Sequence, residues 1–238
     1  PGGRVQAMIE ITWLGHGTFQ LALETGERIL IDPWINGNPK SPAGFEVTRI
    51  DTMLITHGHF DHVGDAVALA RKFKPQVIAN FEICAWLETK GIENACGMNK
   101  GGSQQAGPVR VTMTHALHSS GISDEGKILY GGEAGGYMIH LPDGRTIYFA
   151  GDTAIHAEMG LYAELYRPVI AFLPIGDHFT MSPTEAALAC RMLEVHTVIP
   201  MHFATFPLLS GTPEALAERL KGSDCRVWPL EPGIPVHW

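Results

Sequence analysis

Alternating apolar and polar residues, interrupted by short turns, predict that the chain begins with β-structure. Residues 9–13 are expected to form a strand. Residues 19–23 and 28–31 flank a glycine-containing turn and are expected to pair as a hairpin. The segment 53–56 is almost wholly apolar, which is typical of a strand buried on both faces.

The same periodicity returns in the second half of the chain. Residues 137–141 and 146–150 flank the turn Pro142-Asp143-Gly144-Arg145 and predict a second hairpin. By contrast, residues 94–108 are rich in Gly, Gln and Asn and are expected to form a loop. The other strands expected in this half are 109–113, 169–173 and 197–200.

Three segments have helical patterns. Val63, Val67, Ala70 and Phe73 recur at helical spacing and predict a helix over 64–73. Ser182-Pro183-Thr184-Glu185 is a capping box with proline at the first helical position, and it predicts a helix to about residue 194. Thr212-Pro213-Glu214 predicts a last helix to about residue 220.

The two predicted hairpins resemble each other. Residues 21–32 and 139–152 each form a hairpin that ends in an aspartate shortly after an apolar strand. Two similar β-rich halves with helices outside predict an α/β (α+β) fold, specifically a four-layer αββα sandwich. We expect one domain over residues 8–238. Met8 resembles a natural start, so residues 1–7 are expected to be an extended N-terminus or a vector-derived addition.

Composition narrows the functional class. The 238 residues are 45% hydrophobic and 18% charged, as in ordinary globular proteins. The net charge of −8 and the scattered lysines and arginines argue against nucleic-acid binding. No apolar run is long enough for a membrane helix, and no signal peptide is evident, so a cytoplasmic location is expected. A homo-oligomer is left open.

The cysteines contain no CxxC pair and are expected to be free thiols, with a disulfide as the alternative; they are Cys84, Cys96, Cys190 and Cys225.

Four metal-binding side chains lie within six residues, between a buried strand and a helix. They are His57, His59, Asp61 and His62. Imidazole nitrogens suit zinc and similar first-row ions, and carboxylates can bridge two ions. Four such groups this close favour two neighbouring ions over one. The alternative is a solvated histidine-rich loop, but a polar cluster next to an apolar strand is costly to bury without partners.

Three further candidates follow the ends of predicted strands. They are His118, Asp152 and His202. Loops that leave strand ends are the usual place for α/β active sites. Each residue alone is more typical of a turn or a core, but with the first cluster the three become candidates for the remaining ligands.

Together these motifs resemble the metallo-β-lactamase superfamily. More narrowly, the chain looks like a family of metal-dependent hydrolases related to ascorbate-6-phosphate lactonases. The resemblance extends from Met8 over almost the whole chain. It rests on Trp13-Leu14-Gly15-His16, Ile31-Asp32-Pro33-Trp34, residues 56–62, Leu117-His118-Ser119-Ser120, Ala150-Gly151-Asp152-Thr153, Leu173-Pro174-Ile175-Gly176, Phe179-Thr180-Met181 and Ile199-Pro200-Met201-His202.

The resemblance implies a dinuclear centre. His57, His59 and His118 would bind one ion, Asp61, His62 and His202 would bind the second, and Asp152 would bridge. Zinc is the expected metal, with manganese or iron as alternatives. His115 competes with His118 for one position. Strand alternation places His115 with an apolar face, whereas His118 falls in the loop and matches the family motif, so His118 is favoured.

The expected reaction is hydrolysis of a small ester, lactone or phosphodiester by a metal-activated hydroxide, with Asp61 and Asp152 as catalytic residues. The centre would retain positive charge, which suits an anionic substrate or a developing oxyanion. Asp32 is expected to orient a ligand histidine, or else only to form a turn. Three loop histidines could contact substrate or shuttle protons, or could simply be structural; they are His16, His156 and His178.

Three other functions are weighed against hydrolysis. An iron-dependent redox enzyme resembling thiol dioxygenases would use overlapping ligands, although the diiron oxygen-reducing branch has Glu where this chain has His59. A secreted antibiotic-degrading lactamase is disfavoured by Asp152 and by the lack of a signal peptide. A non-catalytic metal-binding protein is disfavoured because every ligand position is filled.

Overall fold

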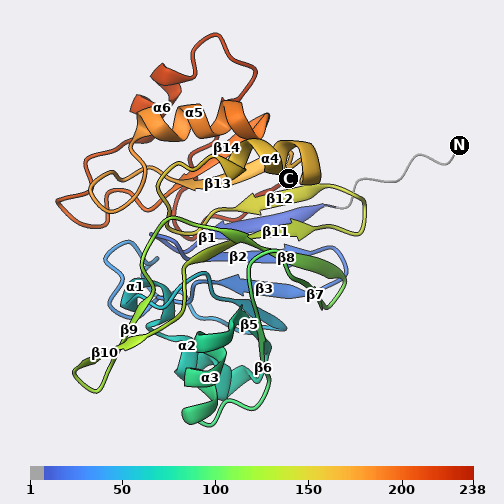
Figure 1. Ribbon diagram of the computed structural model, residues 1–238, viewed down its shortest axis with the longest axis vertical. Helices are drawn as coiled ribbons and strands as arrows, with labels where there is room; N and C mark the ends of the chain where they lie inside the picture. Colours follow the sequence, from blue (N-terminus) through green and yellow to red (C-terminus); the bar gives the residue numbers. More distant parts are fainter. Residues whose placement is uncertain (1–7) are drawn as a thin grey trace, which may run out of the picture.

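Two seven-stranded β-sheets lie face to face, and helices cover the outer side of each sheet (Figure 1). The computed structural model describes residues 8–238. The first sheet has the order β16-β1-β2-β3-β4-β5-β6. Its strands are β1 (Ile9–Trp13), β2 (Phe19–Leu23), β3 (Arg28–Ile31), β4 (Thr52–Leu54), β5 (Gln76–Asn80), β6 (Ala95–Met98) and β16 (Val236–His237).

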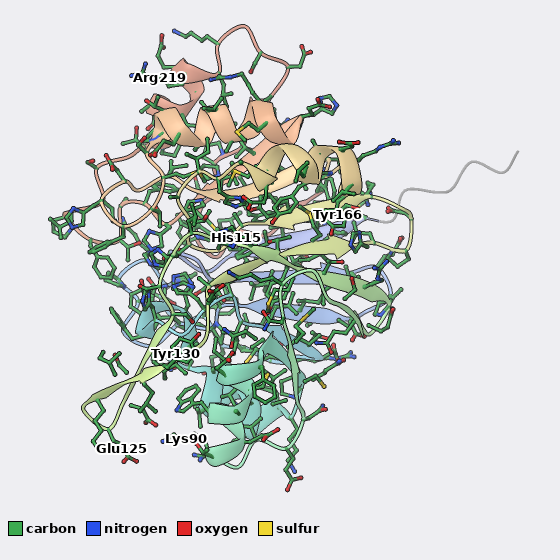
Figure 2. The ribbon with its side chains drawn as sticks, in the orientation of Figure 1. Lys90, His115, Glu125, Tyr130, Tyr166 and Arg219 are labelled. Carbon is green, nitrogen blue, oxygen red and sulfur yellow. The ribbon has the colours of Figure 1, made fainter. Side chains whose placement is uncertain are left out.

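The second sheet has the order β15-β14-β13-β12-β11-β8-β7, and a separate two-stranded hairpin is formed by β9 and β10. The strands of the second sheet are β7 (Ser103–Ala106), β8 (Val109–His115), β11 (Gly135–His140), β12 (Thr146–Phe149), β13 (Ile170–Pro174), β14 (Thr197–Met201) and β15 (Arg226–Val227). The hairpin strands are β9 (Gly121–Asp124) and β10 (Lys127–Tyr130), and Figure 2 shows Glu125 and Tyr130 on the arm that they form.

Helices α2 and α3 pack on the first sheet, and α4, α5 and α6 pack on the second (Figure 1). The helices are α1 (Phe60–Val63), α2 (Ala66–Phe73), α3 (Phe81–Thr89), α4 (Glu158–Tyr166), α5 (Pro183–Leu193) and α6 (Pro213–Arg219). A central apolar layer between the sheets includes Phe19, Tyr137 and Phe149, all fully buried. The predicted αββα sandwich is confirmed.

Each sheet combines an antiparallel hairpin with a run of parallel strands. In the first sheet β2 and β3 are antiparallel, and β3, β4, β5 and β6 are parallel. In the second sheet β11 and β12 are antiparallel, and β12, β13, β14 and β15 are parallel. The internal similarity predicted from residues 21–32 and 139–152 is therefore real. Parallel pairing also brings the carboxyl ends of β3 and β4, and of β12, β13 and β14, to the same edge of their sheets.

One local prediction was wrong. Residues 94–108 contain β6 and β7 instead of one loop, because each strand pairs at the edge of a sheet where polar side chains can face solvent. The helix expected over 64–73 is confirmed as α2 (Ala66–Phe73), and the short helix α1 precedes it. Between them, the Asp65 carboxylate accepts hydrogen bonds from the backbone N–H groups of Ile35 and Asn36.

Other features agree with expectation. Ser182 Oγ accepts the Glu185 N–H, and Glu185 Oε2 accepts the Ser182 N–H, which completes the capping box of α5. All four cysteines are free. Within residues 8–238, no helix is both long enough and apolar enough to cross a membrane.

Candidate metal centre

The seven predicted ligands meet at the carboxyl ends of strands from both sheets. His57 and His59 follow β4, and Asp61 and His62 lie in α1. From the second sheet, His118 follows β8, Asp152 follows β12 and His202 directly follows β14. All seven candidates are therefore brought together from segments up to 145 residues apart in the chain.

Asp32 organises the histidine run from beneath. Its fully buried carboxylate accepts the Thr56 N–H at 2.7 Å and the Thr56 hydroxyl at 2.6 Å. The other contact is with His62 Nδ1, which lies 2.7 Å from Asp32 Oδ2. A carboxylate on Nδ1 leaves Nε2 of His62 as the atom able to bind a metal.

A first group contains three histidines. His57 Nε2 lies 3.1 Å from His59 Nδ1, and His118 completes a set in which one nitrogen from each residue lies within 4.8 Å of the others. Thr56 Oγ1 lies 3.0 Å from His57 Nδ1 and so occupies the nitrogen that faces away from this group. Three imidazole nitrogens in this arrangement can hold a first-row divalent ion.

A second group lies beside it. Asp61 Oδ2 is 3.8 Å from His62 Nε2 and 3.9 Å from His202 Nε2. His16 contributes a fourth potential ligand atom within 4.8 Å of these. The group is almost completely buried, and Asp61 is its most exposed member. Carboxylate and imidazole donors again suit a first-row divalent ion.

Asp152 lies between the two groups. Its Oδ2 atom is 3.7 Å from His57 Nε2 and 3.5 Å from His118 Nε2. The same oxygen is 3.3 Å from His62 Nε2 and 3.0 Å from His202 Nε2. One carboxylate oxygen therefore contacts histidines of both groups.

The distances between the donor atoms suit coordination of metal ions better than direct hydrogen bonds between the side chains. Ligands held about 2.0–2.2 Å from a tetrahedral ion lie about 3.3–3.6 Å apart, close to the spacings around Asp152 Oδ2. The second oxygen, Asp152 Oδ1, is buried and has no hydrogen-bond partner among residues 8–238. A buried carboxylate oxygen without a partner is costly, and a bound cation would remove that cost.

The electrostatics of the ion-free site favour metal binding. Burial lowers the pKa of His57 well below its ordinary value, so this side chain stays neutral and keeps a lone pair for a metal. Burial alone would raise the pKa of Asp152, but His202 and His62 outweigh it and lower the pKa. The carboxylate is therefore ionised at neutral pH and provides the negative charge that a cation requires.

His16 lies beneath Asp61 and is fully buried. Its Nε2 atom is 2.8 Å from Asp61 Oδ2, and its Nδ1 atom is 2.8 Å from Thr205 Oγ1. Burial, followed by the nearby His202, lowers the pKa of His16 to about 4. A neutral His16 can donate one hydrogen bond and accept another, so its position suits the orientation of Asp61 instead of contact with substrate.

The remaining histidine candidates lie outside both groups. His115 is the last residue of β8 (Figure 2). Its Nδ1 atom is 3.0 Å from Lys100 Nζ, and its ring is 5.1 Å from the ring of His156. His156 is buried, with Nδ1 3.1 Å from Glu158 Oε2. His178 is exposed and stands edge-on to Phe179. None of these three histidines lines the cavity over the ligands.

A cavity of about 650 Å³ opens over the ligand groups. Phe206 lines this cavity, whereas Met98 and Phe203 pack against the apolar layer between the sheets. Sequence reasoning missed four apolar residues of the cavity because no periodic pattern distinguishes them from core residues. These are Phe60, Phe179, Pro207 and Leu208.

Comparison with known proteins agrees with this geometry. The family described as "Beta-lactamase superfamily domain" matches residues 27–203. A UPF0173 metal-dependent hydrolase of Solibacter usitatus is 60% identical over 230 residues, which span 97% of this chain and 100% of the relative. One from Rubrobacter xylanophilus is 46% identical over 96% of this chain and 98% of the relative.

Solved structures extend the similarity to three dimensions. Igni18, described as a novel metallo hydrolase from the hyperthermophilic archaeon Ignicoccus hospitalis, is 35% identical with a TM-score of 0.86, over 97% of this chain and 98% of that one. A buried cluster of histidines and aspartates at the strand ends is what such an enzyme needs. The chain therefore belongs to the beta-lactamase superfamily and, within it, to the UPF0173 family of metal-dependent hydrolases.

Proposed function

We propose that the protein hydrolyses a small ester, lactone or phosphodiester at a site that holds two divalent metal ions. The observation that carries this proposal is the position of Asp152 Oδ2, which lies 3.0–3.7 Å from Nε2 atoms of both groups. A shared carboxylate oxygen is the arrangement that a bridge between two ions requires. Zinc suits the five imidazoles and two carboxylates, with manganese or iron as alternatives.

Each ligand has a defined place in the proposed centre. His57, His59 and His118 would hold one ion, and Asp61, His62 and His202 the other, with Asp152 shared. When bound, the ions would supply hydroxide at neutral pH by lowering the pKa of water to about 7. No serine or cysteine nucleophile is then required.

The neighbouring residues position the ligands. Asp32 holds His62 through Nδ1, and His16 holds Asp61 through Nε2. Asp61 and Asp152 are the only carboxylates among the seven ligands, so a filled centre keeps positive charge. That charge would stabilise the oxyanion that develops on a substrate carbonyl or phosphoryl group.

Metal analysis combined with a substrate panel tests the proposal. The protein is purified without added metal, its zinc, manganese and iron contents are measured, and lactones, phosphodiesters, thioesters and β-lactams are assayed. We expect two ions per chain and a turnover that a chelator abolishes and metal restores. One ion per chain would contradict the dinuclear centre. Iron-dependent, oxygen-consuming turnover of a thiol would favour the redox alternative.

A further inference from the structure

The cavity over the ligand groups has a polar floor and an apolar wall. The floor consists of candidate metal ligands, including Asp61, Asp152 and His202. The wall is formed by Phe60, Phe179, Phe206, Pro207 and Leu208. We call these five residues the apolar wall.

The apolar wall is exposed although its side chains are large. The exposed fractions of Phe60, Phe179 and Leu208 are 55%, 50% and 56%. They come from three separate segments, namely α1, the turn after β13 and the turn after β14. Exposed apolar side chains that converge from separate segments on one cavity are typical of a ligand-binding groove.

The backbone holds Phe179 in place. Asp177 and His178 adopt φ values of 63° and 59°, a conformation that is uncommon for residues other than glycine. The turn is fixed by a hydrogen bond from the Phe179 N–H to the Asp177 carbonyl and by another from the Met181 N–H to the Thr153 carbonyl. Phe179 is therefore anchored beside Asp152, and the strained turn is consistent with a functional role.

The other side of the apolar wall rests on Trp34, which is buried. The Trp34 ring stacks on Phe206 with centroids 6.0 Å apart and meets the edge of Phe60 at 5.7 Å. Aromatic contacts of this kind keep side chains in one orientation. The apolar wall is thus supported by the core rather than by surface loops alone.

Charge distinguishes the substrate classes. Among the residues that the structure describes, no lysine or arginine lines the cavity. Phosphate and carboxylate groups of ligands are normally recognised by arginine or lysine. A charged group placed against the apolar wall would lose water without gaining a partner, so this wall disfavours it.

We propose, on the basis of the function proposed above, that the substrate is a neutral carboxylic ester or lactone with an apolar acyl chain or ring that packs against the apolar wall. The reaction consumes one water. Its oxygen bonds to the carbonyl carbon, the bond from that carbon to the leaving oxygen breaks, and the leaving oxygen takes a proton. A cavity of about 650 Å³ has room for an acyl group of several carbons.

A homologous ester series tests the substrate class. With metal-loaded protein, kcat/KM is measured for 4-nitrophenyl acetate, butyrate and octanoate and for bis(4-nitrophenyl) phosphate. We expect kcat/KM to rise roughly three- to fourfold per methylene until the cavity is filled, and to be lowest for the phosphodiester. A rate that is independent of chain length, or a preference for the phosphodiester, would overturn the proposal.

A matched pair of double variants tests whether the apolar wall causes the dependence of kcat/KM on chain length. Phe179→Ala with Leu208→Ala truncates exposed residues of the apolar wall, and should lower kcat/KM for octanoate about tenfold more than for acetate. Leu161→Ala with Leu165→Ala truncates similarly exposed residues of α4 that do not line the cavity, and should leave all rates unchanged. Equal losses in the two double variants would contradict the assignment.

Calorimetry separates this proposal from the proposed hydrolysis. We expect 1-octanol to bind the purified protein much more tightly than 1-butanol, and Phe179→Ala with Leu208→Ala to remove the difference. This binding result would support the apolar substrate class even if no ester were hydrolysed. The absence of ester hydrolysis would contradict only the proposed hydrolysis. Equal binding of both alcohols to the unaltered protein would overturn the substrate class even if esters were hydrolysed.

Discussion

His16 Nε2 lies 2.8 Å from Asp61 Oδ2, while Nδ1 of the same ring lies 2.8 Å from Thr205 Oγ1. This imidazole therefore connects helix α1 to the turn after β14, although Thr205 is 189 residues away from it in the chain. The next residue, Gly17, lies so close to His62 that an added Cβ would be 2.7 Å from His62 Cε1. The turn after β1 thus fits closely against two candidate ligands.

Replacing His16 should weaken metal binding without removing any of the seven proposed ligands. His16→Ala leaves Asp61 free to rotate, and loss of an orienting partner typically lowers metal affinity about 10- to 100-fold. Thr205→Val removes the hydroxyl that contacts His16 Nδ1 and the Phe203 carbonyl, but it keeps the contact between His16 and Asp61 and should have a smaller effect. Competition with a chromogenic chelator measures both affinities. An unchanged affinity in His16→Ala would show that Asp61 is positioned without His16.

Removing the shared carboxylate should affect both ions. We expect Asp152→Ala to abolish most hydrolysis and to lower the metal content from two ions per chain, because its Oδ2 contacts histidines of both groups. Elemental analysis and turnover are measured on the same preparation. Asp124→Asn, which alters a partly buried ion pair with Lys90, is the matched control. Full metal content and activity in Asp152→Ala would refute the dinuclear assignment.

Asp32→Asn should reduce both stability and metal affinity. The carboxylate of Asp32 is fully buried and accepts three hydrogen bonds, from the Thr56 N–H, the Thr56 hydroxyl and His62. An amide in its place would direct a donor at one of these groups, at a cost of about 2–4 kcal/mol in the free energy of unfolding. Urea denaturation with and without chelator separates the two effects. The prediction fails if the denaturation midpoint does not move in the chelated protein.

Acid should destabilise the protein partly through His156. Burial lowers the pKa of His156 below 6.5, and its Nε2 has no hydrogen-bond partner among the described residues. As the pH falls from about 6.5, the unfolded chain therefore binds a proton before the folded protein does, and the stability contribution of His156 decreases towards the folded-state pKa. The melting temperature of His156→Gln between pH 8 and pH 5 should fall less than that of the unaltered protein. Parallel curves would mean that His156 does not contribute.

Chelation should destabilise the protein itself. Without ions, Asp152 Oδ1 stays buried without a partner, and five imidazoles lie beside two carboxylates. A ligand that binds only the folded state at 100 times its Kd stabilises it by about 2.7 kcal/mol. We therefore expect the melting temperature to drop on chelation and to recover with added zinc. The same melting temperature in both states would indicate that no ion binds under those conditions.

Much of the local structure could be predicted because its causes lie within a few residues. The hairpins of β2–β3 and β11–β12 are evident from alternation around a glycine turn. The start of α5 is evident from Ser182 and Glu185, whose reciprocal hydrogen bonds need only adjacent turns of chain. The candidate ligands could also be chosen from the sequence, since residues at the ends of parallel strands converge wherever those strands pair.

Interactions between distant segments could not be predicted in the same way. The edge strands β6 and β7 have no apolar alternation, and they form only because β5 and β8 offer free backbone groups. The apolar wall likewise consists of residues that local patterns cannot distinguish from core residues.

The sequence by itself determined the two hairpins, the cap of α5 and the residues able to bind metal, because these depend on spacing along the chain. Only the tertiary structure decided that Asp152 Oδ2 contacts both groups and that His16 holds Asp61. The physical reason is that such contacts require the two sheets to pack at a fixed separation. That separation is set by the summed volumes of the buried side chains between them, and no local pattern specifies it.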